Sequence, residues 1–205
     1  MVEIEPEMVA AGKELLPDGR WLTGDISAAA GRADLVLVSY VLGELPNVPV
    51  TATRLWEHAT DSIAFVEPGT PAGYRRILEA RASVIGAGGH TVAPCPHDLT
   101  CPLPAHDWCH FAVRLPRSKL HRRAKAVELG YEDEKFSYAV LSREPLAKVP
   151  ARIIRQPQVR SGHVNFVTSE PDGIHQRTVS RKQGRGYKEA KGAAWGDAID
   201  ADERT

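Results

Sequence analysis

The sequence contains no apolar run of about 18 residues, the length that a membrane-spanning helix needs, so no membrane association is expected. It also lacks the features of a targeting peptide. Its first residues, MVEIEPEMVAAGKELL, carry acidic side chains at once, without a basic start followed by an apolar stretch and without an Arg-rich character. These absences predict a cytoplasmic protein of the bacterial type, with no signal or transit peptide.

Cysteine is scarce. Only three cysteines occur in 205 residues, all inside the segment APCPHDLTCPLPAHDWCHF: Cys95, Cys101 and Cys109. An odd number argues against a set of disulfides, and a reducing compartment favours metal binding. The long C-x5-C-x7-C spacing, with prolines, favours a loop around an iron–sulfur cluster over a tight zinc knuckle.

Both kinds of metal centre take four ligands, and the chain offers only three thiols. A zinc site with three cysteines and one histidine is therefore an alternative to a cluster. The histidines within the segment are His97, His106 and His110. Three cysteines that are merely buried are a further alternative, because free cysteine is commonly buried.

The net charge of zero conceals two halves of opposite sign. Residues 1–109 contain 7 Lys and Arg against 14 Asp and Glu, whereas residues 110–191 contain 18 against 8. A basic segment of this length predicts contact with a polyanion. The alternative is a solvated surface that the acidic half neutralises.

Strand-like and helical patterns alternate in the first half, which indicates an α/β fold with a mainly parallel sheet. We expect strands at 21–23, 33–41 and 62–66 and helices at 5–16, 50–59 and 71–85. The apolar run at 33–41 is typical of a strand buried on both faces. Later in the chain we expect a basic helix at 117–129, a strand at 136–142 and two strands flanking a turn at 170–173.

Three regions follow from this organisation. Residues 1–150 form the main domain, which includes the cysteine segment at 93–111. Residues 151–183 form a small antiparallel β unit, and the polar, Gly-rich residues 184–205 form a flexible tail.

Several stretches together resemble a known family. They are VEIEPEMVAAGKEL, ADLVLVSYVLGEL, VEPGTPAGYRRILEAR, VAPCPHDLTCPL, DWCHFAVRLPRSKLHRRAK and GYEDEKFSYAVLSRE. They look like the Rsm-type ribosomal small-subunit methyltransferase-like family, whose mitochondrial members act in assembly of the small subunit. The resemblance implies a class I S-adenosylmethionine methyltransferase fold, a four-iron four-sulfur cluster and binding to small-subunit ribosomal RNA.

The resemblance also assigns individual residues. Cys95, Cys101 and Cys109 match three cluster cysteines, and Ser169 stands where the family has the fourth. Glu3 and Asp25 match the acidic residues after the second and third strands, which would contact S-adenosylmethionine. The first strand and its glycine-rich turn have no counterpart in this sequence, so we expect a partial sheet and an apparently truncated start.

The basic segment predicts phosphate contacts in two clusters. The predicted RNA-binding residues are Arg117, Lys119, Arg122, Arg123, Lys125, Arg177, Arg181 and Lys182. We expect an iron–sulfur protein of the methyltransferase family that acts on the small subunit, with no catalytic residue assigned and methyl transfer left open. A non-catalytic RNA-binding assembly factor and a structural zinc protein are the alternatives.

Overall fold

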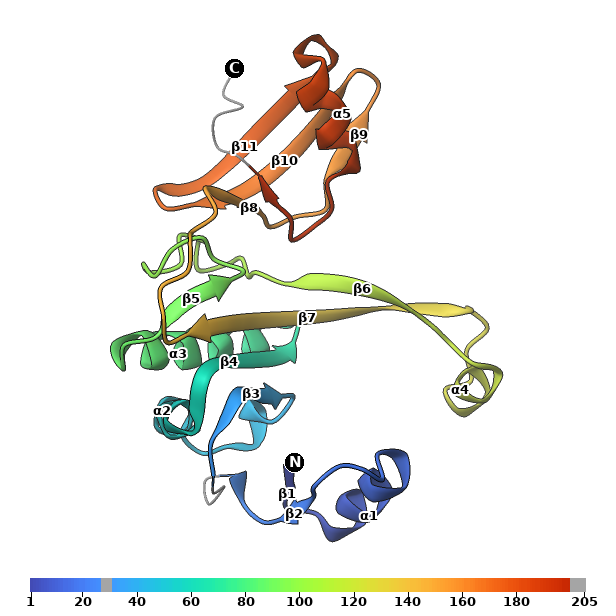
Figure 1. Cartoon of the computed structure of the whole chain (residues 1–205). Helices are drawn as coiled ribbons and strands as arrows, with labels where there is room; N and C mark the ends of the chain where they lie inside the picture. Colours follow the sequence, from blue (N-terminus) through green and yellow to red (C-terminus); the bar gives the residue numbers. More distant parts are fainter. Residues whose placement is uncertain (27–30, 200–205) are drawn as a thin grey trace.

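The computed structural model describes residues 1–26 and 31–199. Figure 1 shows an N-terminal part, a central sheet and a C-terminal β unit arranged in succession, with a long arm projecting sideways from the central sheet. Within the described residues, no helix combines the length and the apolar character needed to cross a membrane.

The N-terminal part is a small pair of parallel strands joined by a helix. β1 (Val2–Glu3) pairs with β2 (Leu22–Thr23), and α1 (Pro6–Leu15) connects them. The ring of Trp21 lies so close to Gly12 that a side chain at Gly12 would collide with it. The helix predicted at 5–16 and the strand predicted at 21–23 are confirmed.

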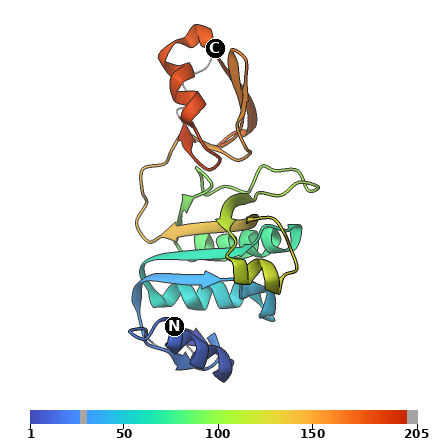
Figure 2. The same ribbon diagram turned by 90° about the vertical axis from the view of Figure 1, so that its right-hand side faces the viewer.

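The central sheet carries the main hydrophobic core. Its strand order is β3–β4–β7–β5, and β6 also pairs with β7. The strands are β3 (Ala33–Ser39), β4 (Ala59–Pro68), β5 (His90–Ala93), β6 (Phe111–Pro116) and β7 (Tyr131–Ser142). Two helices, α2 (Val48–His58) and α3 (Pro71–Gly86), pack side by side against this sheet, as Figure 2 shows. The α/β prediction is confirmed.

The core between the helices and the sheet follows from the apolar patterning of these segments. Side chains from β3, β4, β7, α2, α3 and the short 3-10 helix η2 (Leu42–Glu44) are almost completely buried there. The largest are Val38, Leu42, Leu55, Trp56, Ile63, Phe65, Ile77, Val84 and Leu141. Both helices begin at a capping side chain, because Asn47 accepts the N–H of Val50 and Thr70 accepts the N–H of Gly73.

The prediction of a mainly parallel sheet fails at one strand, because β7 alone runs against the common direction of β3, β4, β5 and β6. β3 and β4 are parallel, but β7 runs antiparallel to β4, β5 and β6. The reason is the connection between β6 and β7, since a strand that returns directly beside its predecessor must reverse its direction.

β3 is also less buried than predicted. Leu35 and Leu37 are 55% and 63% exposed, because β3 pairs only with β4 among the described residues. The pair β1–β2 forms a separate sheet, and an open cleft of about 570 Å³ lies between that pair and β3. The side chains of Val2 and Leu22 line this cleft opposite Leu35.

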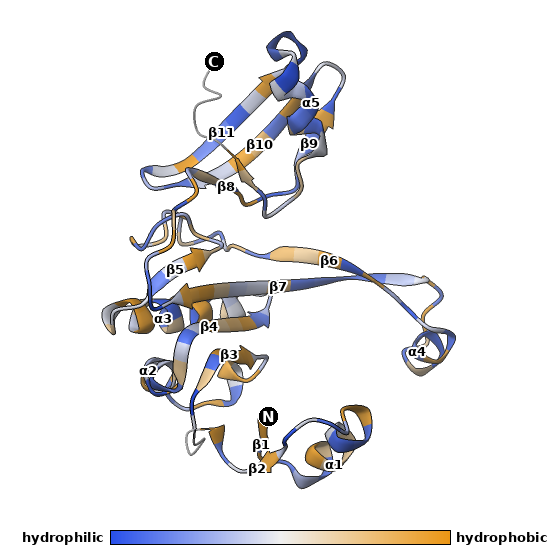
Figure 3. Cartoon of the chain, viewed as in Figure 1, coloured by the Kyte–Doolittle hydropathy of each residue, from blue (hydrophilic) through white to orange (hydrophobic). Residues whose placement is uncertain are grey.

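The arm is the outer part of the β6–β7 hairpin. β4 pairs with Phe136 to Ser142 of β7, so residues 131–135 extend beyond β4 and pair with β6 alone. At about 3.4 Å per residue this extension is roughly 17 Å long. Figure 3 shows the inner half of β7 as hydrophobic and its outer half as hydrophilic. Helix α4 (Lys119–Ala124) lies at the tip of the arm.

The C-terminal unit is antiparallel, as predicted. Its strands are β8 (Ala151–Ile153), β9 (Gln158–Arg160), β10 (His163–Glu170), β11 (Gly173–Ser180) and β12 (Ala198–Ile199). β10 and β11 form a hairpin in which Glu170 pairs with Gly173, so the turn predicted at 170–173 is confirmed. Its core consists of Ile153, Val164, Phe166, Val179 and Ala190.

The tail predicted from residue 184 differs from the structure. Residues 185–192 form α5 (Arg185–Gly192), and β12 then pairs with β8. Ala190 is buried against the hairpin, and Tyr187 packs beside the same cluster. These small and aromatic side chains give a polar segment enough apolar contact to fold. Residues 200–205 of the predicted tail lie outside the described residues.

Candidate metal centre and basic arm

The cysteine segment connects β5 to β6 and folds around one cavity. Cys95, Cys101 and Cys109 all line this cavity, and so does Ser169 of β10. The structure thus brings together the four side chains assigned from the family resemblance. None of the three cysteines is in a disulfide.

The cavity lies between the central sheet and the C-terminal unit. α3 contributes Tyr74 and Ile77, β7 contributes Ser137 and Tyr138, and Ile154 follows β8. Because every wall comes from a different element, the cavity exists only when these elements are assembled. Most of its lining is aliphatic, aromatic or sulfur.

Two arginines fasten the cysteine segment to the C-terminal unit. Arg152 Nε donates to the carbonyl of Pro94 at 3.0 Å, and its Nη1 donates to the carbonyl of Gly196 at 3.0 Å. Arg155 Nη2 forms an ion pair with Asp107 at 2.6 Å. These contacts join segments that are about 50 residues apart in sequence. They therefore fix the position of Ser169 relative to the thiols.

The thiols are surrounded by one another and by apolar walls. Burial raises the pKa of the Cys109 thiol well above its usual value, and neighbouring Cys95 and Cys101 raise it further. Burial also raises the pKa of Cys95, although the Arg81 guanidinium partly opposes this effect. The raised pKa values of Cys95 and Cys109 favour their protonated forms unless a cation compensates the charge of the thiolates. A soft metal centre provides that compensation, so the donor set fits one.

The histidines considered as zinc ligands do not line the cavity formed by the described residues. His97 is 6% exposed, and neither of its ring nitrogens has a hydrogen-bond partner within the described structure. His106 is exposed, and the ring of His110 stacks on Trp108. The arrangement therefore favours Ser169 over these histidines as the fourth side chain at the centre.

A second group of possible metal ligands lies at the β10–β11 turn. Ligand atoms of Glu170, Asp172 and His175 lie within 4.8 Å of one another. Arg177 already binds both carboxylate oxygens of Glu170, and His175 contacts Asp172 at 2.9 Å. These mutual pairs account for the proximity without a metal.

The residues predicted to contact S-adenosylmethionine lie at one edge of the β1–β2 pair. Glu3 ends β1, Asp25 follows β2, and the two strands are parallel in register. Their carboxyl ends therefore meet. Glu3 Oε1 accepts the N–H of Glu5 at 2.9 Å, which places this carboxylate beside the start of α1. Asp25 is exposed.

The arm carries one of the two predicted basic clusters. Arg117 and Lys125 both contact Glu132, at 2.6 and 3.2 Å. These contacts connect the base of α4 to β7. Lys119 and Arg123 are exposed on α4 and line a shallow groove with Arg122. The arm therefore presents α4 as a cationic tip, and Glu132 neutralises part of the charge at its base.

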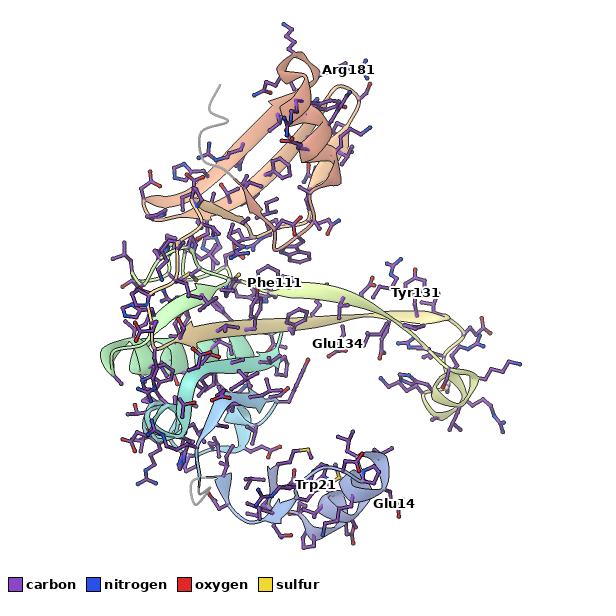
Figure 4. The ribbon with its side chains drawn as sticks, in the orientation of Figure 1. Glu14, Trp21, Phe111, Tyr131, Glu134 and Arg181 are labelled. Atoms are coloured by element: carbon purple, nitrogen blue, oxygen red, sulfur yellow. The ribbon has the colours of Figure 1, made fainter. Side chains whose placement is uncertain are left out.

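The second basic cluster is not continuous with the first. Figure 4 shows Arg181 at the end of the C-terminal unit that is remote from the arm. Lys182 follows it in a short 3-10 helix, η3 (Arg181–Gln183). Arg177, by contrast, is largely buried and binds Glu170 with two hydrogen bonds of 2.7 and 2.6 Å. Its charge is therefore compensated within the fold.

Sequence reasoning missed the contacts that hold the centre in place. Tyr74 donates its hydroxyl to Cys101 Sγ at 2.9 Å, and Ser137 donates to the carbonyl of Cys109 at 2.7 Å. Burial raises the pKa of Tyr74, and the hydrogen bond to Cys101 raises it further. Both residues lie in stretches that carry the family resemblance, but their roles could not be inferred there, because each contacts a cysteine more than 25 residues away.

Comparison with known proteins identifies related chains. The family model described as "Mitochondrial small ribosomal subunit Rsm22" matches residues 2–200. The human "Ribosome assembly protein METTL17, mitochondrial" is 31% identical over 185 residues, which cover 81% of this chain and 39% of the human protein. "Rsm22-cox11 tandem protein 2, mitochondrial" of Schizosaccharomyces pombe is 28% identical over 181 residues, which cover 66% of this chain and 24% of that protein. The chain thus spans less than two fifths of the length of either relative.

Two solved structures that match about 70% of this chain are named as methyltransferases. Magnesium protoporphyrin IX methyltransferase from Synechocystis PCC 6803 with bound SAH has 12% identity and a TM-score of 0.41, covering 70% of this chain and 62% of that chain. A putative methyltransferase from Thermoplasma acidophilum has 11% identity and a TM-score of 0.43, covering 71% of this chain and 59% of that chain.

The comparisons contradict one prediction made from the sequence. The cytoplasmic location inferred from the first residues is wrong, because the relatives are named as mitochondrial proteins. The prediction depended on the absence of an Arg-rich start, and such an absence is weak information about location when only part of the relatives' length is aligned.

Proposed function

Because the chain belongs to the mitochondrial small ribosomal subunit Rsm22 family, we propose that it is a ribosome assembly factor that binds small-subunit ribosomal RNA. We further propose that an iron–sulfur cluster occupies the cavity of the cysteine segment. One observation carries this proposal: the three cysteines and Ser169 line a single cavity at the junction between the central sheet and the C-terminal unit.

Cys95, Cys101 and Cys109 would hold the cluster, with Ser169 as a weak fourth ligand. A bound cluster would supply the positive core that three neighbouring thiolates require. The chain's own residues shape the site around it. Arg152 and Arg155 hold the segment against the C-terminal unit, and mostly apolar walls surround the thiols. A hydroxyl at position 169 makes the fourth bond weaker than a thiolate would.

The alternative of a structural zinc site has less support. Zinc in a three-cysteine site normally takes a histidine as its fourth ligand. His97, His106 and His110 do not line the cavity within the described part of the chain. A bound zinc ion would have to use Ser169 or water instead.

The RNA-binding part of the proposal depends on the arm. Lys119, Arg122 and Arg123 extend from α4, away from the central sheet, where they can reach phosphates without rearrangement of the core. Arg181 and Lys182 would make a second, separate contact. Arg177 is assigned a structural role, because Glu170 already binds its guanidinium.

Methyl transfer is the second candidate function. The carboxyl ends of β1 and β2 meet, which places Glu3 and Asp25 at the edge where a parallel sheet commonly binds its ligand. No residue is assigned as a catalytic base. Calorimetric titration with S-adenosylmethionine tests this candidate, and absence of heat up to millimolar ligand removes it for this chain.

Anaerobic purification followed by analysis of iron, sulfide and zinc tests the metal. We expect iron with sulfide and a brown chromophore, whereas zinc without colour would identify a zinc site. Co-sedimentation with small ribosomal subunits at low and high salt tests the RNA contact. Binding should weaken steeply as salt rises, because phosphate contacts release counterions. Failure to sediment with the subunit at any salt concentration would refute the RNA-binding function.

A further inference from the structure

A groove lies on the outer side of the cysteine cavity. This groove, of about 460 Å³, runs between α3 and residues 100–108 of the cysteine segment. Cys101 lines both the groove and the cavity, whereas Cys95 and Cys109 line only the cavity. The groove therefore reaches the centre at one corner, the corner that Cys101 occupies.

Tyr74 forms the wall between the two spaces. Its side chain lines both, and its hydroxyl donates to Cys101 Sγ at 2.9 Å. Only 8% of Tyr74 is exposed, so the ring has little freedom to turn away. The hydroxyl is thus the polar group that holds the sulfur at the open corner.

The backbone of Tyr74 is fixed by the start of α3. Its N–H donates to the carbonyl of Thr70 at 2.9 Å, in the first turn of the helix. Gly73 lies against the carbonyl of Pro68 with no room for a side chain. On the other side of the groove, Trp108 Nε1 donates to the carbonyl of Gly69 at 3.0 Å. Both walls are therefore attached to the same turn between β4 and α3.

We propose that Tyr74 is a positioning residue that holds Cys101 toward the cavity and so controls the loss of metal through the groove. This inference rests on the proposed metal centre and identifies Cys101 as its most labile ligand. Loss of a metal begins when one ligand dissociates, and Cys101 is the thiol that borders the groove. A hydrogen bond to this sulfur opposes its displacement and tunes the centre electronically.

The chain offers a matched control for this idea. Tyr138 lines the same cavity, but no hydrogen bond joins its hydroxyl to a sulfur in the described structure. Tyr74→Phe and Tyr138→Phe each delete one hydroxyl and keep the ring, so packing changes little in either. Thermal unfolding of the metal-free variants checks that both remain folded.

The first measurement is the loss of iron from the anaerobically purified full chain to bathophenanthroline disulfonate. We expect Tyr74→Phe to lose iron about fivefold faster than the original chain, the ratio that corresponds to one hydrogen bond. Its midpoint potential should be more negative, because a hydrogen bond to sulfur favours the reduced centre. Tyr138→Phe, which breaks no hydrogen bond to a sulfur in the described structure, should change both readouts much less than Tyr74→Phe. Equal behaviour of the two variants would overturn the inference.

A second measurement does not need the metal. In the metal-free chain, iodoacetamide should alkylate Cys101 before Cys95 and Cys109, and Tyr74→Phe should accelerate the reaction at Cys101 alone. Mass analysis of peptides reads out each site. If the chain binds neither iron nor zinc, the proposed centre fails, and this inference fails with it. If metal binds but Cys95 or Cys109 reacts first, only the assignment of the open corner is refuted.

Discussion

Glu170→Gln should lower the free energy of unfolding by about 3 kcal/mol, because it removes one partner of a buried ion pair. Arg177 donates to both oxygens of Glu170 at 2.7 and 2.6 Å, and Thr168 adds a third hydrogen bond at 2.8 Å. The side chains of Glu170 and Arg177 are only 8% and 15% exposed. Substitution by glutamine would leave the guanidinium in this place without its counter-charge.

Urea denaturation of the metal-free chain at neutral pH measures this effect. With a slope of about 2 kcal/mol per molar urea, the midpoint should fall by about 1.5 M. Glu189→Gln is the matched control. Arg185 contacts Glu189 at a similar 2.7 Å, but these side chains are 93% and 59% exposed, so no measurable change is expected. If both variants lowered the urea midpoint equally, burial of the Glu170–Arg177 pair would not be the source of the stability.

Two further measurements test the contribution of the Glu170–Arg177 pair. Addition of Arg177→Met to Glu170→Gln should recover most of the loss, because an apolar side chain leaves no buried charge. Burial raises the pKa of Glu170, but hydrogen bonds from Arg177 and Thr168 bring it below its usual value. The stabilisation by this carboxylate is therefore complete above the pKa of the unfolded chain and is lost as pH falls through the lower folded value. Glu170→Gln should abolish this part of the acid sensitivity.

Three other changes test the remaining parts of the structure. Ser169→Cys completes a set of four thiols, so we expect more iron per chain and slower loss of the chromophore after anaerobic purification. Joint substitution of Arg122 and Arg123 by alanine should weaken binding to small-subunit RNA and reduce the slope of log affinity against log salt by about 1 to 2, as fluorescence anisotropy would measure. Gly73→Ala should lower the thermal unfolding temperature, because the new Cβ would collide with the carbonyl oxygen of Pro68.

Local signals were enough to predict the elements of the first half of the fold. The helix at 71–85 follows from Thr70, which caps it, from Pro71 in its first turn and from its apolar spacing. The strand at 62–66 is an apolar run, and the structure extends it at both ends to form β4. Helices and strands that are favoured by their own residues could therefore be predicted from the sequence.

Helices and strands that depend on partners distant in the sequence could not be predicted in this way. The basic helix predicted at 117–129 ends at Ala124, because it buries no side chain and has nothing to pack against. The acidic run at 131–135 is a strand because β6 supplies opposite partners, such as Arg114 for Asp133. The exposure of β3 likewise reflects the neighbours of the strand in the sheet, and its own residues do not encode it.

The residues of the candidate centre likewise include some that the sequence could predict and some that it could not. The cysteines could be recognised because they lie within fifteen residues of one another. Ser169 could be named only through the family resemblance, because it is sixty residues further along the chain. The roles of Tyr74 and Arg152 depend on contacts with residues far away in the sequence. The residues next to them in the chain do not reveal these contacts.

β7 belongs at once to the arm and to the lining of the cysteine cavity. Its outer five residues form one side of the projection that ends in α4, and its inner residues include Ser137, whose hydroxyl binds the carbonyl of Cys109. The inner residues of β7 are paired with β4 and β5, so the arm is held in the same sheet that supports the sulfur-bearing loop through Ser137. The arm and the cysteine segment therefore depend on one strand, and unpairing of β7 would disturb both at once.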